Sequence, residues 1–403
     1  MRTTYLKHLL PIIVAVLVVG LFAPQPLVAA PASPLDSVSG LKRSSLLVLD
    51  QHGNEKFSVR PDEFMVPAST LKIMTALLAL EHWGRDFRFH TDFYIDKKKF
   101  LWIKGYGDPY LISEEITRIA ARLKKAGVKR VSGIGVDGSF FAKSISIDGR
   151  DRSLSPYDAP VGAVSANFNT VFFINDPVNG VSSAEPQTPL TPVVHELVQE
   201  YSDFGEQRLN LGDPNRVPRY FAELLRAKLG AIGVTVGEPI KLGAVPKGSK
   251  RVYRHFNRHT LQEIVRGMLK ASNNFIANQL FLMLGAQTYG APANLDKSQR
   301  YAAERIRAIF DWEEFDMVEG SGLSRRNRFT ARQLVTLLQY FKPYRDLMPS
   351  NQRSILAKTG TLTNVSCYAG YVESGKDWAP FALLINQPVE RGLRYRLARY
   401  LVD

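Results

Sequence analysis

An apolar stretch with a hydroxyl and an amine directly ahead of it constrains this chain more than any other feature. Residues 73–80 are almost wholly apolar and predict a buried helix, and Ser69 and Lys72 precede them. Residues three apart lie on the same face of a helix, so this helix would hold Ser69 in its first turn with the Lys72 amine beside it. A lysine can act as the base for a serine when apolar surroundings lower its pKa. The stretch therefore predicts a nucleophile and its base.

The Ser-x-x-Lys pattern is weakly specific on its own. Ser39 and Lys42 also match it, although they lie in a polar stretch with no apolar helix behind them. The assignment of Ser69 and Lys72 therefore depends on partners found further along the chain.

A second polar pair lies where another helix is expected to begin. Ser272 and Asn274 directly precede or open the mostly apolar run 275–284. Polar residues at a helix start usually cap free N–H groups, so a capping role and a role toward substrate both remain open. Ser165 and Asn167 repeat the spacing in a region that we expect to be a strand, which shows how easily this match arises.

A third group combines a cation, a hydroxyl and a glycine between two expected strands. Lys358, Thr359, Gly360 and Thr361 follow an apolar stretch and precede another over residues 367–372. Adjacent antiparallel strands are expected here, with 381–385 as a further strand. A strand edge with a glycine that admits a ligand to the backbone could bind a carboxylate. The alternative is a solvated edge lysine.

The rest of the chain divides by character into a split core and an insertion. A hairpin is expected over residues 44–60, and longer elements return near residue 251. The division predicts a core made of residues 33–92 and 246–403, interrupted by an inserted domain over 93–245. The expected elements of the insertion are strands at 100–104 and 131–136, helices at 113–126 and 219–229 (the latter stopped by Gly230) and a proline-rich loop at 186–192. Further core helices are expected at 260–269, 296–310 and 330–341.

Residues 1–32 have the form of a secretory signal. Arg2 and Lys7 precede an apolar run over residues 9–23, and small residues follow at 28–32. An uncleaved membrane anchor is the alternative, but the run is shorter than the roughly 20 residues that span a bilayer. We therefore expect a signal peptide that is cleaved and a periplasmic or other extracytoplasmic location.

Composition limits the classes of binding partner and cofactor that we expect. The net charge is +14, which favours anionic partners such as cell-wall polymer or acidic lipid and suggests peripheral association with the wall or membrane. The basic residues are scattered and the chain is expected to be exported, which argues against nucleic acid. The one cysteine, Cys367, has no intrachain partner, so a packed core must supply stability. The seven histidines show no metal-ligand spacing, so neither a metal nor a cofactor is expected.

The three groups occur in the order that marks penicillin-binding proteins and serine β-lactamases. With the long insertion, and with further matches at 105–109, 159–165 and 320–325, the chain resembles the D-alanyl-D-alanine carboxypeptidase/endopeptidase family, the class C low-molecular-mass penicillin-binding proteins. The resemblance implies an α/β (α+β) fold, in which an antiparallel sheet with a helical cluster carries an inserted mixed α/β domain. Two positions depart from the family pattern: Asn273 replaces the usual Asp, and Asn278 replaces a common Glu.

The resemblance also implies a reaction on peptidoglycan. Ser69 would attack the carbonyl between two D-alanines of a stem peptide, Lys72 would take its proton, and Ser272 would relay the proton to the leaving amine. β-Lactam antibiotics would acylate Ser69 in the same way.

Substrate binding would then fall to the remaining residues of the second and third groups. Asn274 would hold the substrate amide, and Lys358 with Thr359 would hold the terminal carboxylate or tune Ser272. Gly360 would admit the ligand to the strand, and the N–H groups of Ser69 and Thr361 would form the oxyanion hole.

Two other functions remain as alternatives. Residues 206–210 match the Glu-x-x-Leu-Asn string that carries the deacylating base of one β-lactamase class, but Glu206 precedes Ser272, which is the wrong chain order for that class. A catalytically silent peptidoglycan-binding protein on the same fold is the second alternative. The balance between trimming terminal D-alanine and cutting D-alanyl-meso-diaminopimelyl crosslinks is left open.

Overall fold

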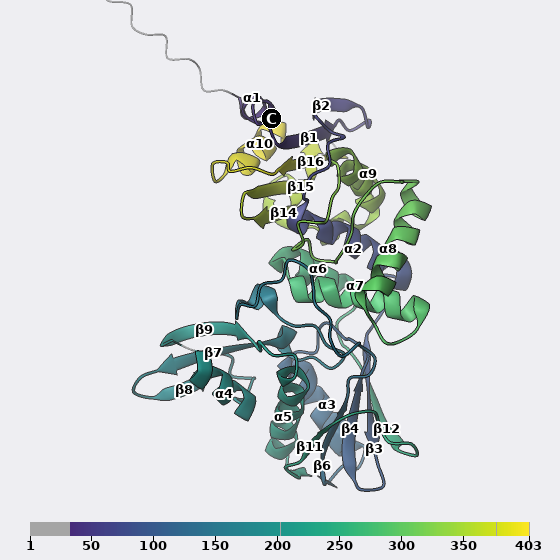
Figure 1. The fold of residues 1–403 in the computed structure, drawn as a ribbon, viewed down its shortest axis with the longest axis vertical. Coiled ribbons are helices and arrows are strands. Elements are labelled where there is room, and N and C mark those ends of the chain that lie inside the picture. Colours follow the sequence, from purple (N-terminus) through teal and green to yellow (C-terminus); the bar gives the residue numbers. More distant parts are fainter. Residues whose placement is uncertain (1–32, 202, 376, 403) are drawn as a thin grey trace, which may run out of the picture.

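The structure is a computed structural model that describes residues 33–201, 203–375 and 377–402. The predicted signal peptide, residues 1–32, lies outside the described residues. The chain is elongated, with a six-stranded sheet and its helices at one end and smaller sheets at the other (Figure 1). Within the described part, no helix combines the length and the hydropathy that crossing a membrane requires.

The six-stranded sheet has the order β13-β14-β15-β16-β1-β2, and every neighbouring pair in it is antiparallel. It confirms the predicted hairpin over 44–60 and the predicted antiparallel strands near the C-terminus. Its strands are β1 (Ser44–Leu49), β2 (Glu55–Val59), β13 (Ser350–Gln352), β14 (Ile355–Leu362), β15 (Val365–Ser374) and β16 (Asp377–Ile385).

Both faces of this sheet are covered, which explains why β1 is buried along its whole length and why its last four residues are all apolar. Successive side chains of a strand point to opposite faces. Leu46 and Val48 pack against α1 (Pro34–Ser39) and α10 (Leu393–Val402), while Leu47 and Leu49 face the main helical core.

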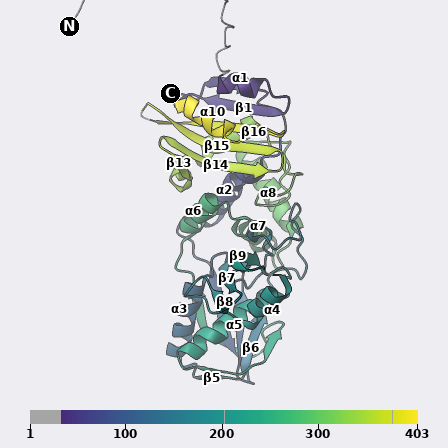
Figure 2. The same cartoon turned by 90° about the vertical axis from the view of Figure 1, so that its left-hand side faces the viewer.

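The helical cluster lies between the six-stranded sheet and the smaller sheets (Figure 2). Its centre is α2 (Lys72–Trp83), which is buried along its length from Lys72 to Leu80 and is preceded by a 3₁₀ turn, η1 (Ala68–Leu71). The predicted helices of the core are present. They are α6 (Leu261–Ala271), α7 (Asn274–Tyr289), α8 (Leu295–Phe310) and α9 (Ala331–Phe341), followed by η4 (Lys342–Leu347).

The other end of the molecule has its own hydrophobic core. A five-stranded mixed sheet of order β11-β6-β4-β3-β12 packs with two helices, and the buried residues of this core run from Phe93 to Val234. Strand β12 pairs with β3 and thereby completes this sheet. The elements are β3 (His90–Ile95), β4 (Phe100–Gly105), β6 (Gly133–Asp137), β11 (Ile240–Leu242), β12 (Lys250–Phe256), α3 (Ser113–Lys125) and α5 (Arg216–Ala231), with a short pair β5 (Arg130–Val131) and β10 (Thr235–Val236).

A three-stranded antiparallel sheet projects sideways from this end as an arm (Figure 1). It consists of β7 (Thr170–Asp176), β8 (Gly180–Ser183) and β9 (Gly205–Asn210), with α4 (Pro192–Tyr201) beside it.

Several local predictions were wrong for identifiable reasons. Ser69 lies in the 3₁₀ turn before α2 rather than in its first α-helical turn. The segment 131–136 is divided between β5 and β6, which belong to different sheets, and α5 runs through Gly230. Residues 165–167 lie in a loop that enters the 3₁₀ turn η3 (Asn167–Asn169), not in a strand.

Candidate active site

The Ser69 hydroxyl and the Lys72 amine are adjacent. Lys72 Nζ donates to Ser69 Oγ at 2.9 Å, and the lysine side chain is completely buried. The same Nζ donates to Asn274 Oδ1 at 2.7 Å and to the Ser321 carbonyl at 2.6 Å. These contacts fix the amine against the hydroxyl whose proton it would have to accept.

Burial also tunes this amine. Desolvation lowers the pKa of Lys72 well below its usual value, and the nearby positive charge of Lys358 lowers it further, while the carboxylate of Glu319 opposes the shift. A lysine with a lowered pKa supplies a neutral amine at lower pH than an exposed lysine does. The pair therefore has both the geometry and the electrostatics of a nucleophile with its base.

A loop that contains Gly322, distant in the sequence, packs against the 3₁₀ turn that carries Ser69. Gly322 has φ +83° and lies so close to the 3₁₀ turn that a Cβ there would be 1.9 Å from the Ala68 carbonyl oxygen. Only glycine allows this approach at this backbone conformation. Ala68 is itself in a left-handed conformation, with φ +46°.

Glu319 organises that loop and is fully buried. Its Oε2 accepts from the Ser321 N–H at 2.8 Å and its Oε1 from the Gly322 N–H at 2.6 Å. Asn278 donates to Oε2 at 3.1 Å and Asn327 to Oε1 at 2.7 Å. Residues 320–325 match the family pattern, but Glu319 was not predicted from the sequence. Its only signal there is an acid next to a glycine-serine-glycine turn.

The second group lies beside Lys72, and the structure shows which of its residues caps α7. Ser272 ends α6 in a left-handed conformation, with φ 54°. The cap of α7 is Asn273, whose side chain accepts from the Ile276 N–H at 2.9 Å. Asn274 is therefore free of the capping role, and besides Lys72 it bonds the Tyr157 carbonyl at 3.1 Å.

The two departures from the family pattern keep local hydrogen bonds. Asn273 performs the N-cap that an Asp could also perform. Asn278 donates to Glu319 and accepts from the Gly320 N–H at 2.8 Å. Both substitutions thus retain polar partners around the site.

The third group lies on β14, where β13 no longer pairs with it. β13 pairs only with Ile355 and Leu356, so the strand is unpaired on that side at Lys358. Lys358 is 2% exposed and donates to the Thr359 carbonyl at 2.8 Å, which excludes the solvated edge lysine. Burial, together with the charge of Arg394, lowers the pKa of Lys358 to about 8.

Gly360 is required by the protein itself. A Cβ at Gly360 would be 2.7 Å from the Pro67 carbonyl oxygen, so the glycine lets β14 pack against the turn that carries Ser69. Arg394, from α10, was not predicted as a site residue. Its Nη1 donates to the Gly360 carbonyl at 3.1 Å and to Thr361 Oγ1 at 2.8 Å.

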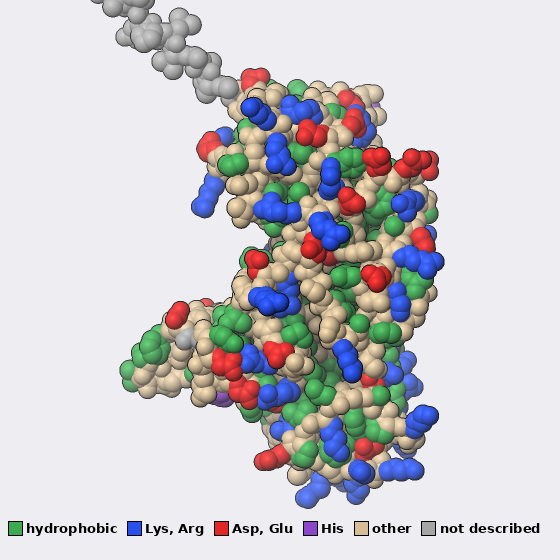
Figure 3. All heavy atoms as spheres, viewed as in Figure 1, with side chains coloured by type: hydrophobic (Ala, Val, Ile, Leu, Met, Phe, Trp, Pro, Cys, Tyr) green, Lys and Arg blue, Asp and Glu red, His purple; other side chains and the backbone are tan. Residues whose placement is uncertain are grey.

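These groups meet in one cleft of about 580 Å³. Lys72 and Lys358 are buried and do not line it, whereas several residues of the segment 149–158 do. The molecular outline is hollowed between the six-stranded sheet and the projecting arm (Figure 3). The predicted residues that line the cleft are Ser69, Ser272, Asn274, Thr359 and Thr361.

Two other predictions concern residues outside this set. Glu206 is exposed on β9 of the arm and does not line the cleft, so it cannot serve there as a deacylating base. Within the part of the chain that the structure describes, no three His, Cys, Asp or Glu side chains are grouped to hold a metal ion.

Comparison with known proteins identifies the family. The family model described as D-Ala-D-Ala carboxypeptidase 3 (S13) matches residues 42–202 and 213–351. The chain belongs to this S13 family. As a member of it, the protein is a serine peptidase that acts on D-alanyl-D-alanine, and its fold is the one the resemblance implied.

Sequence relatives of this S13 peptidase cover most of its length. The D-alanyl-D-alanine carboxypeptidase DacB of Haemophilus influenzae is 23% identical over 80% of this chain and 81% of that protein. The D-alanyl-D-alanine carboxypeptidase of Actinomadura sp. strain R39 is 25% identical over 89% of this chain and 81% of that protein.

Solved structures agree with the fold. Penicillin-binding protein 4 from Haemophilus influenzae superposes with a TM-score of 0.72 at 19% identity, covering 89% of this chain and 95% of that chain. Bd3459, a predatory peptidoglycan endopeptidase from Bdellovibrio bacteriovorus, has a TM-score of 0.52 at 16% identity, covering 90% and 91%.

Proposed function

We propose that this S13 peptidase cleaves peptidoglycan stem peptides through an acyl-enzyme on Ser69, with Lys72 as the base. The observation that carries the proposal is the buried Lys72 Nζ at 2.9 Å from Ser69 Oγ. Its lowered pKa favours the neutral amine that proton transfer needs.

Acylation then follows in two steps, attack on the carbonyl and departure of the leaving amine. The Ser69 oxygen bonds to the carbonyl carbon between two D-alanines, and its proton passes to Lys72. The C–N bond breaks as a proton reaches the leaving amine, a transfer that we assign to Ser272 on the same cleft. The N–H groups of Ser69 and Thr361 hold the oxyanion, a contribution typically of about 3 kcal/mol per donor.

Binding of the substrate is assigned to Asn274 and Thr359, which line the cleft, and to Lys358 and Gly360, which adjoin Thr359 on β14. Lys358 and Thr359 hold the terminal carboxylate, Asn274 holds an amide of the stem peptide, and Gly360 brings β14 against the Ser69 turn. In the acyl-enzyme from a peptide, the departing D-alanine opens a path for water, and Lys72 can activate that water. In a penicilloyl-enzyme the leaving group stays tethered and blocks it.

Both carboxypeptidase and endopeptidase activity are part of the proposal. The relatives from Haemophilus influenzae and Actinomadura are named carboxypeptidases, and Bd3459 is described as a peptidoglycan endopeptidase. Incubation with defined muropeptides, with products identified by mass, measures the two activities separately.

Domain organisation and location are proposed on the same basis. We assign residues 33–92 and 246–403 to the peptidase core and 93–245 to the insertion. The separate hydrophobic cluster supports an insertion, and β12 (Lys250–Phe256) extends the sheet of that cluster beyond residue 245. We also propose export through residues 1–32 and peripheral contact of this basic protein with the wall or membrane.

The assignment is tested by labelling with penicillin. The label should be recovered on Ser69 alone, as measured by peptide mapping of the purified protein, whereas label on Ser39, Ser165 or Ser272 contradicts the assignment. Lys72→Arg should remain folded but fail to acylate, because guanidinium does not give up its proton near neutral pH. Normal acylation of folded Lys72→Arg would show that another group is the base.

A further inference from the structure

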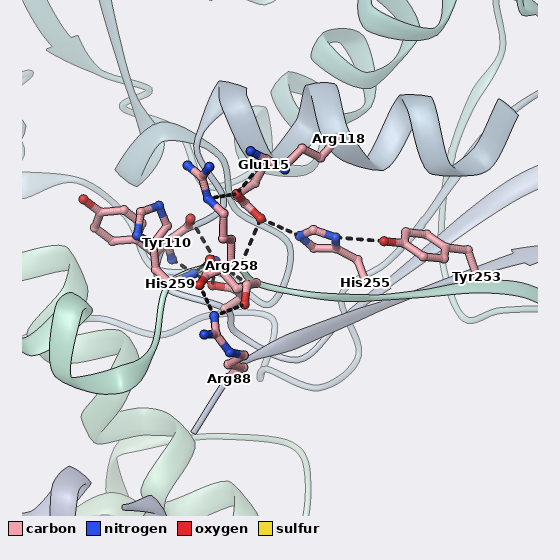
Figure 4. Close-up of polar contacts among 10 residues, drawn as sticks. Arg88, Tyr110, Glu115, Arg118, Tyr253, His255, Arg258 and His259 are labelled. Carbon is pink, nitrogen blue, oxygen red and sulfur yellow. Dashed lines mark hydrogen bonds and ion pairs between the residues drawn. The ribbon is translucent and has the colours of Figure 1, made fainter. Parts of the chain in front are cut away.

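A second pocket, away from the peptidase cleft, lies between α3 and the end of β12. It has a volume of about 460 Å³ and shares no lining residue with the cleft that contains Ser69. Figure 4 shows Glu115 on α3 between Arg258 and His255, with Arg118 beside Glu115 and Tyr253 beyond His255. The pocket is therefore a separate feature that the peptidase reaction does not use.

The pocket carries a marked excess of positive charge. Its lining includes four arginines and one carboxylate, Glu115. The arginines are Arg88, Arg118, Arg122 and Arg258. Arg122 forms no ion pair within the described residues. Arg88 is held by the Asn257 and Arg258 carbonyl oxygens rather than by an acid. One carboxylate cannot neutralise this set, so the pocket attracts anions.

Glu115 acts as an anchor for two of the guanidinium groups. It is fully buried, and its Oε1 lies 3.7 Å from the Nε atoms of both Arg118 and Arg258. The side chains of Arg118 and Arg258 nevertheless remain 53% and 55% exposed. At 3.7 Å these contacts are ion pairs rather than hydrogen bonds, so the carboxylate attracts both guanidinium groups while their side chains stay exposed and line the pocket.

The anchor is itself built into the protein. Glu115 Oε2 contacts His255 Nε2 at 3.0 Å and accepts from the Arg258 N–H at 3.1 Å, and His255 Nδ1 contacts the Tyr253 hydroxyl at 3.2 Å. Burial alone raises the pKa of Glu115, but the bonds from His255 and Arg258 outweigh it, so its pKa lies below the usual value. The carboxylate is therefore charged and held in place, and its charge attracts the guanidinium groups of Arg118 and Arg258.

We propose that this pocket binds a phosphorylated sugar. Guanidinium groups match phosphate oxygens in bidentate geometry, and several uncompensated cations favour a dianion over a single carboxylate. The volume far exceeds that of a bare ion. Tyr253 and Phe256 line it with aromatic surface, and Phe256 is 57% exposed, which suits the apolar face of a sugar ring. The ligand is either a soluble sugar phosphate or a phosphorylated glycolipid of the cell envelope.

The test measures binding by isothermal titration calorimetry with glucose 6-phosphate, inorganic phosphate and glucose. Glucose 6-phosphate should bind more tightly than phosphate, and glucose should not bind. Arg118→Gln/Arg122→Gln should weaken binding about tenfold or more, since both residues are exposed on α3 and Gln is a good helix former. Lys97→Gln/Lys98→Gln removes the same charge from the exposed β3–β4 turn and should leave the affinity unchanged.

Vesicles that carry a phosphorylated glucosamine lipid distinguish the two sources. If the unmodified protein co-sediments with these vesicles and Arg118→Gln/Arg122→Gln does not, the ligand is the glycolipid. If the unmodified protein binds glucose 6-phosphate but does not co-sediment, the ligand is the soluble sugar phosphate. Both variants should acylate with penicillin at the rate of the unmodified protein, which verifies folding. Binding of neither ligand, equal loss in the lysine control, or phosphate binding as tightly as glucose 6-phosphate would overturn the proposal.

Discussion

Replacement of the buried carboxylate beneath the active site should damage both stability and acylation. In Glu319→Ala, the N–H groups of Ser321, Gly322 and Ser324 lose their acceptor, as do the side chains of Asn278 and Asn327. Each unsatisfied buried donor typically costs about 1–3 kcal/mol, but water entry and relaxation reduce the sum. Removing one partner of a buried charged network typically costs about 3–5 kcal/mol, which is the loss in unfolding free energy that we expect.

Removal of the Glu319 charge should also change the pH dependence of acylation, which the loss of a purely structural residue would not do. The Glu319 carboxylate raises the pKa of Lys72, so its loss should lower that pKa further. In Glu319→Gln, which keeps the volume, the pH at which acylation rises as Lys72 loses its proton should therefore shift downward. The maximal rate should also fall, because the Ser321 carbonyl that accepts from Lys72 at 2.6 Å is less firmly held.

Urea unfolding followed by circular dichroism measures the first effect, and the rate of labelling by a fluorescent penicillin across pH measures the second. Glu304→Ala is a suitable control, because Glu304 is exposed and forms an ion pair with Arg300 that should contribute less than about 1 kcal/mol. The reasoning fails if the unfolding free energy of Glu319→Ala lies within about 1 kcal/mol of that of the unmodified protein and the fluorescent penicillin labels both at the same rate.

Three further predictions concern the strand and the loop around Ser69. Since the pKa of Lys358 is about 8, Lys358 loses its charge as pH rises through about 8, and kcat/KM for substrates with a free terminal carboxylate should fall there. The same fall with amidated substrates would contradict a role for the charge of Lys358. Arg394→Gln should move this fall to higher pH, because Arg394 lowers the pKa of Lys358, and should slow acylation by releasing Thr361; an unchanged pH profile would refute the coupling. Gly322→Ala should cost roughly 2–4 kcal/mol in urea unfolding, because its Cβ would meet the Ala68 carbonyl at 1.9 Å, whereas Gly138→Ala, with open space around it, should be near neutral.

Local sequence patterns were sufficient for most of the core. The apolar run behind Ser69, the periodicity of the later helices and the alternation near Lys358 each reflect burial of one face of one element, which short-range spacing reports directly. The order of the three polar groups identified the family. The patterns were weakest in the insertion, where the strands are short. The helix α4 of the arm was not predicted, although its buried residues Val193, Val194, Leu197 and Val198 have helical spacing.

The active site itself was decided by contacts between distant segments. Lys72 bonds to Asn274 and to Ser321, which lie 202 and 249 residues away along the chain. Gly360 is needed because β14 approaches the Pro67 carbonyl, and Arg394 reaches the same strand from α10. The sequence shows which residues can carry a proton or a charge and where a glycine permits close packing of the backbone. It does not show their pKa values and pairings, because desolvation and hydrogen bonding depend on which surfaces meet when the chain folds.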